Sequence, residues 1–287
     1  MIEFHKRYSI PFTSPLQIGN TLVAHKDVLP FSFSENNKTY SFELSPLQGL
    51  HEESLDDAQK SLTDFIAGRT DNMLPSARFA YEGAKYIDNI QSMSVLINAL
   101  YIPNNDSDFP ENKTLKIKIN RTSFEKDIES INHLTQKGYK LRLDANRSLS
   151  EEQLYHYWYA IKDHAAIEYF EEPLVNGEAH LSLKEFIPIA FDESSENFID
   201  KKLPENIVSF VIKPSVMFGI ERTRELMKTK SIIVSSAFET PLQLLALIKL
   251  STLQKDTAMG LDTLKYFPLE FIPNTLNYRD GQIIFNA

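Results

Sequence analysis

Leu141-Arg-Leu-Asp-Ala-Asn146 is a short apolar run that ends in a carboxylate, and it is one of five runs of this kind in the chain. Each run has the length and apolar character of a buried β-strand, and each has an ionisable residue at its downstream end. Those residues are Lys118, Asp144, Glu171, Asp192 and Lys213. The intervals between them are 26, 27, 21 and 21 residues, enough for one strand and one helix each. In a parallel sheet or barrel, this period brings two lysines and three carboxylates to one edge.

From residue 94 onward, short apolar runs recur eight times. They cover 95–102, 114–119, 140–145, 167–172, 188–193, 207–213, 231–237 and 258–262. Most intervals hold a helix-compatible segment, at 123–137, 149–164, 180–186, 218–229 and 240–254. Strands that alternate with helices and are apolar on both faces predict a parallel sheet whose two faces are both covered. Eight strands favour a modified (β/α)8 barrel of the TIM type, irregular at 103–113, where the interval is too short and polar for a helix.

The first 93 residues have a different pattern. Two runs, 28–34 and 39–45, read as strands around the polar turn Glu35-Asn-Asn-Lys38, and two helical patterns follow. We therefore predict an α/β protein with an α+β capping domain over 1–93 and the modified barrel over 94–267. The tail, 268–287, ends in an apolar run and is expected to pack back on the cap.

The composition fits one enzyme-sized unit and excludes several classes of function. Of the 287 residues, 42% are hydrophobic, which is ordinary for a globular protein. The absence of cysteine excludes disulfides, thiolate metal sites and cysteine nucleophiles. A formal charge of −9 argues against nucleic-acid binding. The start of the chain has no long apolar segment, and no stretch reaches about 18 apolar residues, so we expect a cytoplasmic protein without membrane contact.

Three of the strand-end residues, Asp144, Glu171 and Asp192, are carboxylates. Hard oxygen ligands suit Mg²⁺, and an oxygen-rich site also accepts Mn²⁺. Three converging carboxylates without a cation would raise one another's pKa, so a divalent ion makes the arrangement tenable. Each acid taken alone could instead cap a helix or pair with a nearby cation. Their shared position at successive strand ends favours the metal site.

The lysines complete the set. Lys116 and Lys118 are two residues apart, so they point to the same face of a strand. Because adjacent ammonium groups and a nearby dication both disfavour positive charge, the pKa of Lys118 is expected to fall from about 10.4 towards that of a useful base. On a solvent-facing edge the same pair would serve solubility. Lys213 follows a wholly apolar run, so it either meets an anion or a π-face inside the barrel or extends outward at the strand end.

Weaker signals surround this set. Arg142 and Asn146 flank the first carboxylate at a spacing of two and share its face. Ser235 and Ser236 end an apolar run, where they could hydrogen-bond a substrate carboxylate or start a helix. Asp262 could orient a lysine or cap the last strand.

Together these residues resemble the enolase superfamily. Within it they resemble the lysine–lysine subgroup of muconate-lactonising enzymes, dipeptide epimerases and o-succinylbenzoate synthases. Members have a capping domain and a modified barrel, and the resemblance covers nearly the whole chain. It implies that the three carboxylates bind Mg²⁺ and that Lys118 is the base, tuned by Lys116. It also implies that Lys213 faces Lys118 across the substrate.

Several segments are similar to the o-succinylbenzoate synthase family in particular. They are 141–147, 170–173, 192–194, 211–214 and 260–263 in the barrel, and 43–49 and 52–59 in the cap. The resemblance places Gly260 and Asp262, with Arg142, Asn146, Ser235 and Ser236, at the substrate. The late histidine base of mandelate racemases is absent from Ser235-Ser-Ala-Phe-Glu239, and Leu261-Asp-Thr263 lacks the Asp-x-Asp of dipeptide epimerases. A first covering loop is expected within 10–30.

The implied function is Mg²⁺-dependent syn-dehydration of 2-succinyl-6-hydroxy-2,4-cyclohexadiene-1-carboxylate to o-succinylbenzoate, in menaquinone or phylloquinone biosynthesis. Lys118 would take the proton α to the carboxylate and return it to the departing hydroxyl. Mg²⁺ would act as a Lewis acid, and Lys213 would stabilise the delocalised anion. The expected partner is therefore a small-molecule carboxylate, and the sequence is compatible with a monomer or a homo-oligomer.

Two other hypotheses stay open. The same two lysines could racemise N-acylamino acids or epimerise dipeptides, with one lysine deprotonating and the other reprotonating. A barrel that binds a metal or a partner but has lost turnover is the third, and the complete set of five strand-end residues argues against it.

Overall fold

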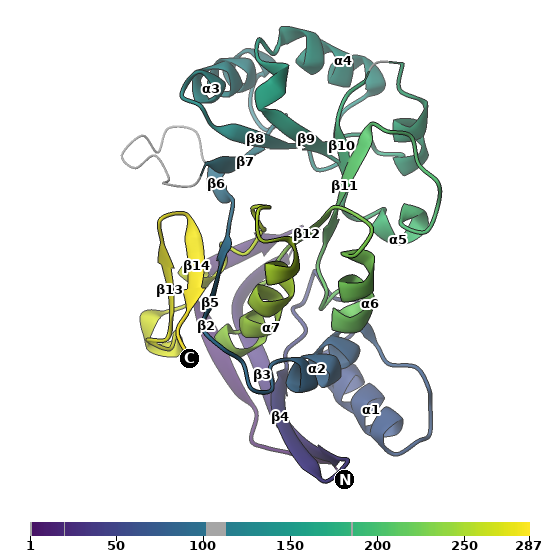
Figure 1. The fold of residues 1–287 in the computed structure, drawn as a ribbon, viewed down its shortest axis with the longest axis vertical. Helices are drawn as coiled ribbons and strands as arrows, with labels where there is room; N and C mark the ends of the chain where they lie inside the picture. Colours follow the sequence, from purple (N-terminus) through teal and green to yellow (C-terminus); the bar gives the residue numbers. More distant parts are fainter. Residues whose placement is uncertain (1, 20, 102–112, 185) are drawn as a thin grey trace.

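The computed structural model describes residues 2–19, 21–101, 113–184 and 186–287. It has two parts, which Figure 1 shows one above the other. The lower part contains the N-terminal antiparallel sheet and its helices. The upper part contains most of a parallel sheet with helices packed around it, and the last strand and helices of that sheet reach down beside the N-terminal part. Much of the interval 103–113, where we predicted an irregular connection, lies outside the described residues.

The N-terminal sheet has four antiparallel strands. They are β1 (Ile2–Phe4), β2 (Tyr8–Ile18), β3 (Thr21–Glu35) and β4 (Lys38–Leu44). The long β3 pairs with all three others. Asn36 and Asn37 both have positive φ, 50° and 61°, as a two-residue hairpin turn requires, so the predicted polar turn is confirmed. The region 10–30 forms the β2–β3 hairpin, whereas we had expected a covering loop there.

Two helices cover one face of this sheet, α1 (Leu55–Ile66) and α2 (Pro75–Tyr86). The first begins with a capping box between Ser54 and Asp57, which satisfies two backbone N–H groups at its start. The second packs closely on β4, because a Cβ on Gly83 would lie 2.8 Å from the ring of Phe42. A small residue is therefore required at this helix–sheet contact.

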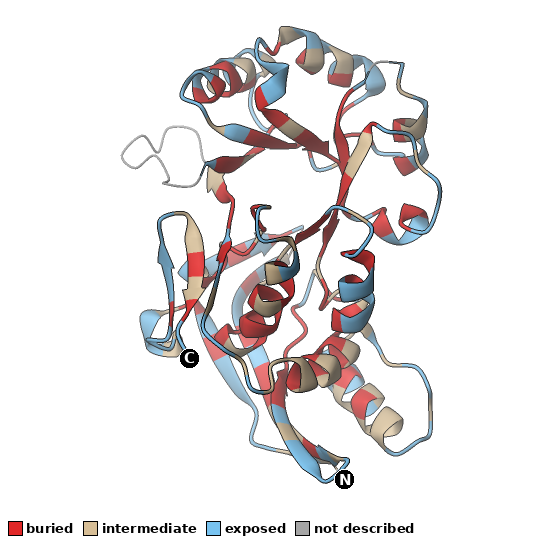
Figure 2. Cartoon of the chain, viewed as in Figure 1, coloured by how far each residue is buried: buried red, intermediate tan, exposed pale blue. Residues whose placement is uncertain are grey.

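The second part is built on seven parallel strands in the order β12-β11-β10-β9-β8-β7-β6. They are β6 (Ala99–Tyr101), β7 (Thr114–Lys118), β8 (Lys140–Asp144), β9 (Ile167–Glu171), β10 (Ile189–Phe191), β11 (Ile207–Ile212) and β12 (Ile232–Val234). Neighbours in the sheet are also neighbours in the chain. The strands are almost wholly buried, as Figure 2 shows, because helices cover their outer face.

The connecting helices are α3 (Phe124–Gln136), α4 (Glu151–Ala160), α5 (Ser195–Phe198), α6 (Gly219–Leu226) and α7 (Pro241–Ser251). Short 3-10 helices lie at His164–Ala166, Gly177–Ser182, Thr252–Gln254, Leu264–Tyr266 and Leu269–Phe271. The helix α7 begins with a side-chain cap by Thr240 and has Pro241 at its first position. The segment 180–186, predicted as helix-compatible, is instead partly covered by the 3-10 turn Gly177–Ser182.

The first and last predicted barrel strands differ from the prediction. The run 95–102 divides into β5 (Met93–Leu96) and β6, and β5 belongs to another sheet. The run 258–262, predicted as the eighth strand, forms two isolated parallel bridges, Met259 with Ile97 and Gly260 with Ser235. The seven-stranded sheet therefore curls so that 259–260 reaches both the end of β12 and the start of β6.

The C-terminal tail forms the hairpin β13 (Leu276–Arg279) and β14 (Gln282–Phe285). Its second strand pairs antiparallel with β5, in register from Gln282↔Leu96 to Phe285↔Met93. The tail thus lies at the junction of the two parts (Figure 1).

Two carboxylates, Glu82 and Glu43, connect the N-terminal part to the parallel sheet. Glu82 of α2 accepts hydrogen bonds from the backbone N–H of Ile220 (2.6 Å) and Glu221 (3.0 Å) at the start of α6. Glu43 of β4 accepts one from the hydroxyl of Thr240, and its carbonyl accepts another from the side-chain amide of Gln243 (2.9 Å). Because helix N-termini carry unsatisfied N–H groups and a positive dipole, both carboxylates hold the cap against helix starts.

Candidate active site

Five strands bring the predicted set to one edge of the parallel sheet. Lys118 is the register partner of Asp144, and Asp144 is the register partner of Glu171. Asp192 and Lys213 directly follow β10 and β11, the next two strands in the sheet. The parallel order therefore places a lysine at each end of a row of three carboxylates, as the spacing in the sequence indicated.

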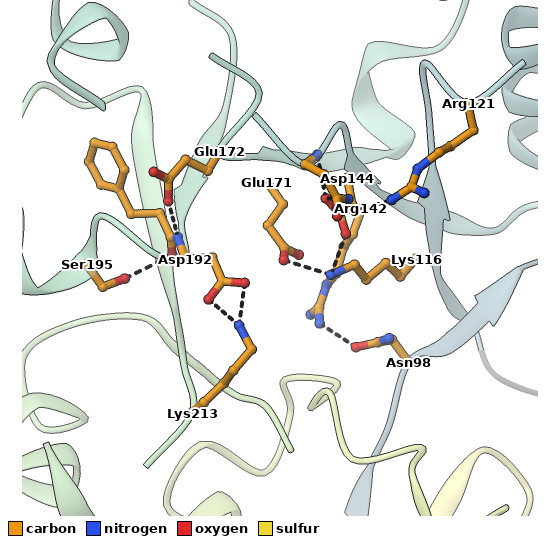
Figure 3. A network of polar contacts seen from close by, with 12 residues as sticks. Asn98, Lys116, Arg121, Arg142, Asp144, Glu171, Glu172, Asp192, Ser195 and Lys213 are labelled. Carbon is orange, nitrogen blue, oxygen red and sulfur yellow. Dashed lines mark hydrogen bonds and ion pairs between the residues drawn. The ribbon is translucent and has the colours of Figure 1, made fainter. Parts of the chain in front are cut away.

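Lys116 is hydrogen-bonded to two of the carboxylates, as Figure 3 shows. Its Nζ lies 2.7 Å from Oε1 of Glu171 and 2.9 Å from Oδ2 of Asp144. Burial lowers its pKa, but the charges of these two carboxylates outweigh burial, so the pKa of Lys116 lies above its ordinary value. Lys116 is thus a fixed cation rather than a base.

Lys213 approaches the third carboxylate. Its Nζ donates to both Oδ1 and Oδ2 of Asp192 (Figure 3). Burial lowers its pKa, and the charges of Asp192 and Glu171 raise it to a net value above the ordinary one. The lysine meets an anion and does not extend into solvent, so it stays an ammonium group at neutral pH.

Lys118 has the opposite electrostatics. Burial is the largest cause that lowers its pKa, and the positive charges of Lys116 and Arg121 act in the same direction. Asp144 opposes the shift, and the pKa of Lys118 is still below the ordinary lysine value. Of the three lysines in the set, Lys118 is the one whose neutral, proton-accepting form is favoured.

The carboxylates differ in their surroundings. Burial raises the pKa of Glu171 to about 7, with Lys116 opposing and the charges of Asp144 and Asp192 adding to the rise. Asp144 is also buried, but Lys116 holds its pKa below the usual range. Asn146 contributes to this, because its backbone N–H and side-chain amide both donate to Oδ1 of Asp144, at 2.9 and 2.6 Å. Neighbouring acids with separated pKa values are typical of functional sites.

A cavity of about 170 Å³ opens beside this set. Lys116, Lys118, Glu171, Ser235, Ser236, Gly260 and Asp262 are among the residues that line it. A Cβ on Gly260 would lie 2.9 Å from Oγ of Ser235, so the glycine allows the serine hydroxyl its place. The hydroxyl of Ser236 donates to Glu239 and lies 2.8 Å from Oγ1 of Thr263. Ser236 therefore also holds its own loop in shape.

Arg142 and Asn146 are not among the residues that line the cavity. The Arg142 side chain is 2% exposed, donates to Glu168 Oε2 (2.6 Å) and Asn98 Oδ1 (3.1 Å), and stacks over the ring of Tyr169. Through these contacts Arg142 supports Asn98 and Tyr169, which do line the cavity. Direct substrate binding by Arg142 stays a prediction.

The structure adds residues that the sequence did not single out: Asn98, Tyr169, Phe238, Lys265 and Tyr266. Tyr169 could have been found, because it stands two residues before Glu171 and shares its face of β9. Lys265, on the 3-10 helix Leu264–Tyr266, forms an ion pair with Asp262, three residues earlier. Asn98 and Phe238 lie on irregular segments, where no sequence pattern indicated a functional residue.

The β2–β3 hairpin reaches this cavity from the cap. The ring of Phe12 lies 6.0 Å from that of Phe238 and 5.2 Å from that of Phe267, measured between centroids. The hydroxyl of Thr13 donates to the carbonyl oxygen of Tyr266 (3.4 Å). The hairpin thus packs on two residues that line the cavity, and it occupies the place expected of a covering loop.

The donor chemistry of the three carboxylates fits Mg²⁺, since all offer hard oxygen ligands from adjacent strand ends. Within the described ranges, no three His, Cys, Asp or Glu side chains converge as a group able to hold a metal ion. The carboxylate oxygens of Asp144, Glu171 and Asp192 point instead at the ammonium groups of Lys116 and Lys213.

None of the helices that the structure describes is long and apolar enough to span a membrane.

Two comparisons of the sequence with known proteins found similar proteins. Residues 111–228 match the family model described as enolase C-terminal domain-like. The chain is 28% identical over 287 residues to the o-succinylbenzoate synthase of Escherichia coli O6:K15:H31, covering 90% of this chain and 89% of the relative.

Solved structures show the same fold. One is an o-succinylbenzoate synthase from Thermosynechococcus elongatus with Mg in its active site (TM-score 0.74, 22% identity, 90% and 92% of the two chains). Another is the L-Ala-D/L-Glu epimerase from Bacillus subtilis (TM-score 0.75, 18% identity, 99% and 95%). The predicted resemblance is therefore confirmed: over about 90% of its length the chain is similar to proteins named o-succinylbenzoate synthase, and residues 111–228 match the enolase C-terminal domain-like family.

Proposed function

We propose that this relative of the o-succinylbenzoate synthases converts 2-succinyl-6-hydroxy-2,4-cyclohexadiene-1-carboxylate to o-succinylbenzoate by Mg²⁺-dependent syn-dehydration, in menaquinone or phylloquinone biosynthesis. One observation carries the proposal. A row of three carboxylates lies between Lys118 on β7 and Lys213 after β11, at the edge of a cavity. A base, a second cation and an oxygen-donor set are the groups needed to remove a proton next to a carboxylate.

Asp144, Glu171 and Asp192 would hold the Mg²⁺. When bound, the ion supplies Lewis-acid chemistry that favours negative charge on the substrate carboxylate. Lys116, which pairs with two of the three carboxylates, favours their ionised form and so opposes the effect of burial on their pKa. The Mg in the active site of the Thermosynechococcus relative supports this assignment. Mn²⁺ is the alternative that an oxygen-rich site also accepts.

Lys118 is the proposed base. Its lowered pKa favours the neutral amine, which accepts the proton from the carbon α to the substrate carboxylate. The resulting ammonium group then gives that proton to the departing hydroxyl. The C–O bond breaks, water leaves, and the electron pair of the broken C–H bond completes the aromatic ring. Loss and return of the proton on one face correspond to syn elimination.

Lys213 would act as a cation on the other side of the substrate. Its raised pKa and its pairing with Asp192 keep it charged, which suits stabilisation of a delocalised anion. Ser235, with room provided by Gly260, would donate to a substrate carboxylate. Lys265, paired with Asp262 on the cavity wall, would donate a hydrogen bond to the succinyl carboxylate. Phe12 and its partners would exclude water on the cap side.

The domain organisation fits this function. We infer that 258–262 closes the sheet into a modified (β/α)8 barrel, since its backbone bridges Ile97 and Ser235 on either side. On this basis the capping domain covers 1–93, the barrel covers 94–267, and 268–287 returns to the cap through β14. The catalytic set then lies at the carboxyl-terminal mouth, where barrels place their active sites.

Epimerisation or racemisation is a second candidate. It is favoured by the two lysines at opposite ends of the carboxylate row, because one can remove a proton that the other returns from the opposite face. The substrate would be a dipeptide or an N-acylamino acid. Incorporation of deuterium from solvent into both stereoisomers of such a substrate, without loss of water, would identify this reaction.

The decisive experiment is a steady-state assay of the purified protein that follows loss of the cyclohexadiene absorbance. It is run with Mg²⁺, with excess chelator, and with the chelator followed by added Mg²⁺ or Mn²⁺. We expect rapid formation of o-succinylbenzoate that the chelator abolishes and the metal restores. A folded protein that binds Mg²⁺ but gives no product would refute the dehydratase assignment and direct attention to epimerisation.

A further inference from the structure

Glu172, the second acid of Glu-Glu-Pro, is a buried charged residue that the proposed chemistry does not use. It directly follows β9 and is 1% exposed. Its φ is +32°, which is uncommon for a residue with a side chain and requires compensation from its surroundings. Figure 3 shows its carboxylate turned towards the backbone of Asp192, whereas Glu171 points at Lys116. The two adjacent acids thus have different partners.

The carboxylate of Glu172 is satisfied by the turn that follows β10. Its Oε2 accepts hydrogen bonds from the backbone N–H of Asp192 (2.9 Å) and of Ser194 (3.0 Å). Its Oε1 accepts one from the hydroxyl of Ser194. Because an ionised carboxylate is purely an acceptor, it can hold all three donors at once. The backbone from which the Asp192 side chain projects is therefore fixed by Glu172.

A second loop meets the same carboxylate. Nε of Arg147 lies 3.6 Å from Oε1 of Glu172, and Arg147 stands three residues after Asp144. Its NH2 group also donates to the carbonyl oxygen of Val175 (2.7 Å), beyond Glu172. The guanidinium therefore bridges the end of β8 to the end of β9. It also offsets part of the cost of burying the Glu172 charge.

The turn after β10 is held from the other side as well. A Cβ on Gly177 would lie 2.7 Å from Oγ of Ser194 and 2.9 Å from the ring of Phe198. The chain after β9 therefore packs directly on Ser194. Glu172 and Gly177 together leave the Ser194 hydroxyl little room to move.

We propose that Glu172 is a positioning residue that sets the spacing of Asp144, Glu171 and Asp192 by tying together the ends of the three strands that carry them. This inference rests on the proposed Mg²⁺ site formed by those carboxylates. Arg147 connects Glu172 to the end of β8, and Glu172 itself follows β9. The N–H groups of Asp192 and Ser194 connect it to the end of β10. Partners that orient metal ligands commonly change metal affinity by roughly 10- to 100-fold when removed.

The test is a titration of the full-length protein with Mg²⁺ alone, followed by isothermal calorimetry and intrinsic fluorescence. We expect Glu172→Ala to weaken Mg²⁺ binding about 100-fold. Glu172→Gln, whose side-chain carbonyl can still accept from the two N–H groups, should weaken Mg²⁺ binding less than Glu172→Ala, by about tenfold. Ser194→Ala removes a single contact and should have a smaller effect. Glu171→Gln, which alters a proposed ligand, and Glu178→Gln, which alters an exposed acid nearby, serve as the two controls.

The outcomes separate this inference from the function on which it rests. If the wild type binds Mg²⁺ and Glu171→Gln weakens binding, an unchanged dissociation constant in folded Glu172→Gln and Ser194→Ala overturns the role of Glu172 alone. If the wild type does not bind Mg²⁺, the metal site and this inference fall together. Because Glu172→Gln and Ser194→Ala are mild changes, they decide the question even if Glu172→Ala does not fold. Circular dichroism and the thermal midpoint without Mg²⁺ report folding independently.

Discussion

The ammonium group of Lys116 on β7 lies 2.7 Å from Oε1 of Glu171 on β9, two strands away in the sheet. This contact passes across the end of β8, where the same ammonium group also reaches Asp144. The contact gives the two lysines of the Lys-x-Lys pair different electrostatic surroundings. Lys116 is held as a cation by carboxylates, and its charge adds to burial in lowering the pKa of Lys118, the proposed base.

Replacement of the proposed base should remove nearly all turnover without unfolding the protein. Lys118→Ala removes the proton acceptor, so we expect kcat for dehydration to fall by roughly 10²- to 10⁴-fold. Lys126→Ala, which removes an exposed lysine of α3, is the matched control and should keep the wild-type rate. Initial rates are compared at saturating substrate and Mg²⁺, with circular dichroism as the check on folding. A wild-type kcat in Lys118→Ala would remove this lysine from the mechanism.

The pH profile should report the lowered pKa of Lys118. The neutral amine is the active form, so kcat/KM rises with pH and levels off once Lys118 is deprotonated. Because the pKa is below the ordinary lysine value, the inflection should lie below about 10.4. Lys116→Met removes a positive charge that lowers this pKa, so its inflection should move to higher pH. The profile of Lys126→Met should coincide with that of the wild type, and an unmoved inflection in Lys116→Met would contradict the coupling.

Acid should destabilise the fold through His51. Its burial, assisted by the charge of Lys26, lowers its pKa from 6.5 to about 4, against the opposing charges of Glu53 and Glu239. The unfolded chain therefore takes up a proton that the folded protein resists. The contribution of His51 to the free energy of unfolding is fully present above about pH 6.5 and is lost as the pH falls to about 4. This contribution is about 3 kcal/mol. Urea unfolding from pH 7 to pH 4 measures it.

A variant separates this effect from general acid denaturation. His51→Gln has no proton to take up in this range, so the drop in its unfolding free energy between pH 7 and pH 4 should be smaller than in the wild type. His5→Gln, at an exposed position, should retain the full drop. Equal drops in all three proteins would exclude His51 as the cause.

Gly260 should prove essential for the position of Ser235. In Gly260→Ala the new methyl group would lie 2.9 Å from Oγ of Ser235, so the hydroxyl must turn away from the cavity. Loss of one hydrogen bond to the substrate predicts a KM about three- to tenfold higher. In a Ser235→Ala background the same glycine change should cost less, because the clashing oxygen is gone. Additive effects in this double-mutant cycle would contradict the contact.

Local signals were enough to predict much of the fold. Ser54, with Asp57 three residues later, starts a helix because a capping box involves only neighbouring residues. The paired asparagines at 36 and 37 turn the chain because such residues tolerate positive φ. The β2–β3 hairpin was missed because the exposed and buried residues of β3 do not alternate regularly over its length. The run 258–262 was predicted as a strand because it is apolar, but only two of its residues bridge to neighbours.

The sequence by itself determined which ionisable residues end which strands, since strand period and strand-end position are properties of short stretches. Tertiary structure alone decided what each of them touches. Lys116 is bound to Glu171, Arg142 is enclosed by Glu168 and Asn98, and Glu172 holds the turn at Asp192. These partners are 20 to 55 residues apart in the chain, and their contacts exist because the curl of one sheet places its strand ends side by side.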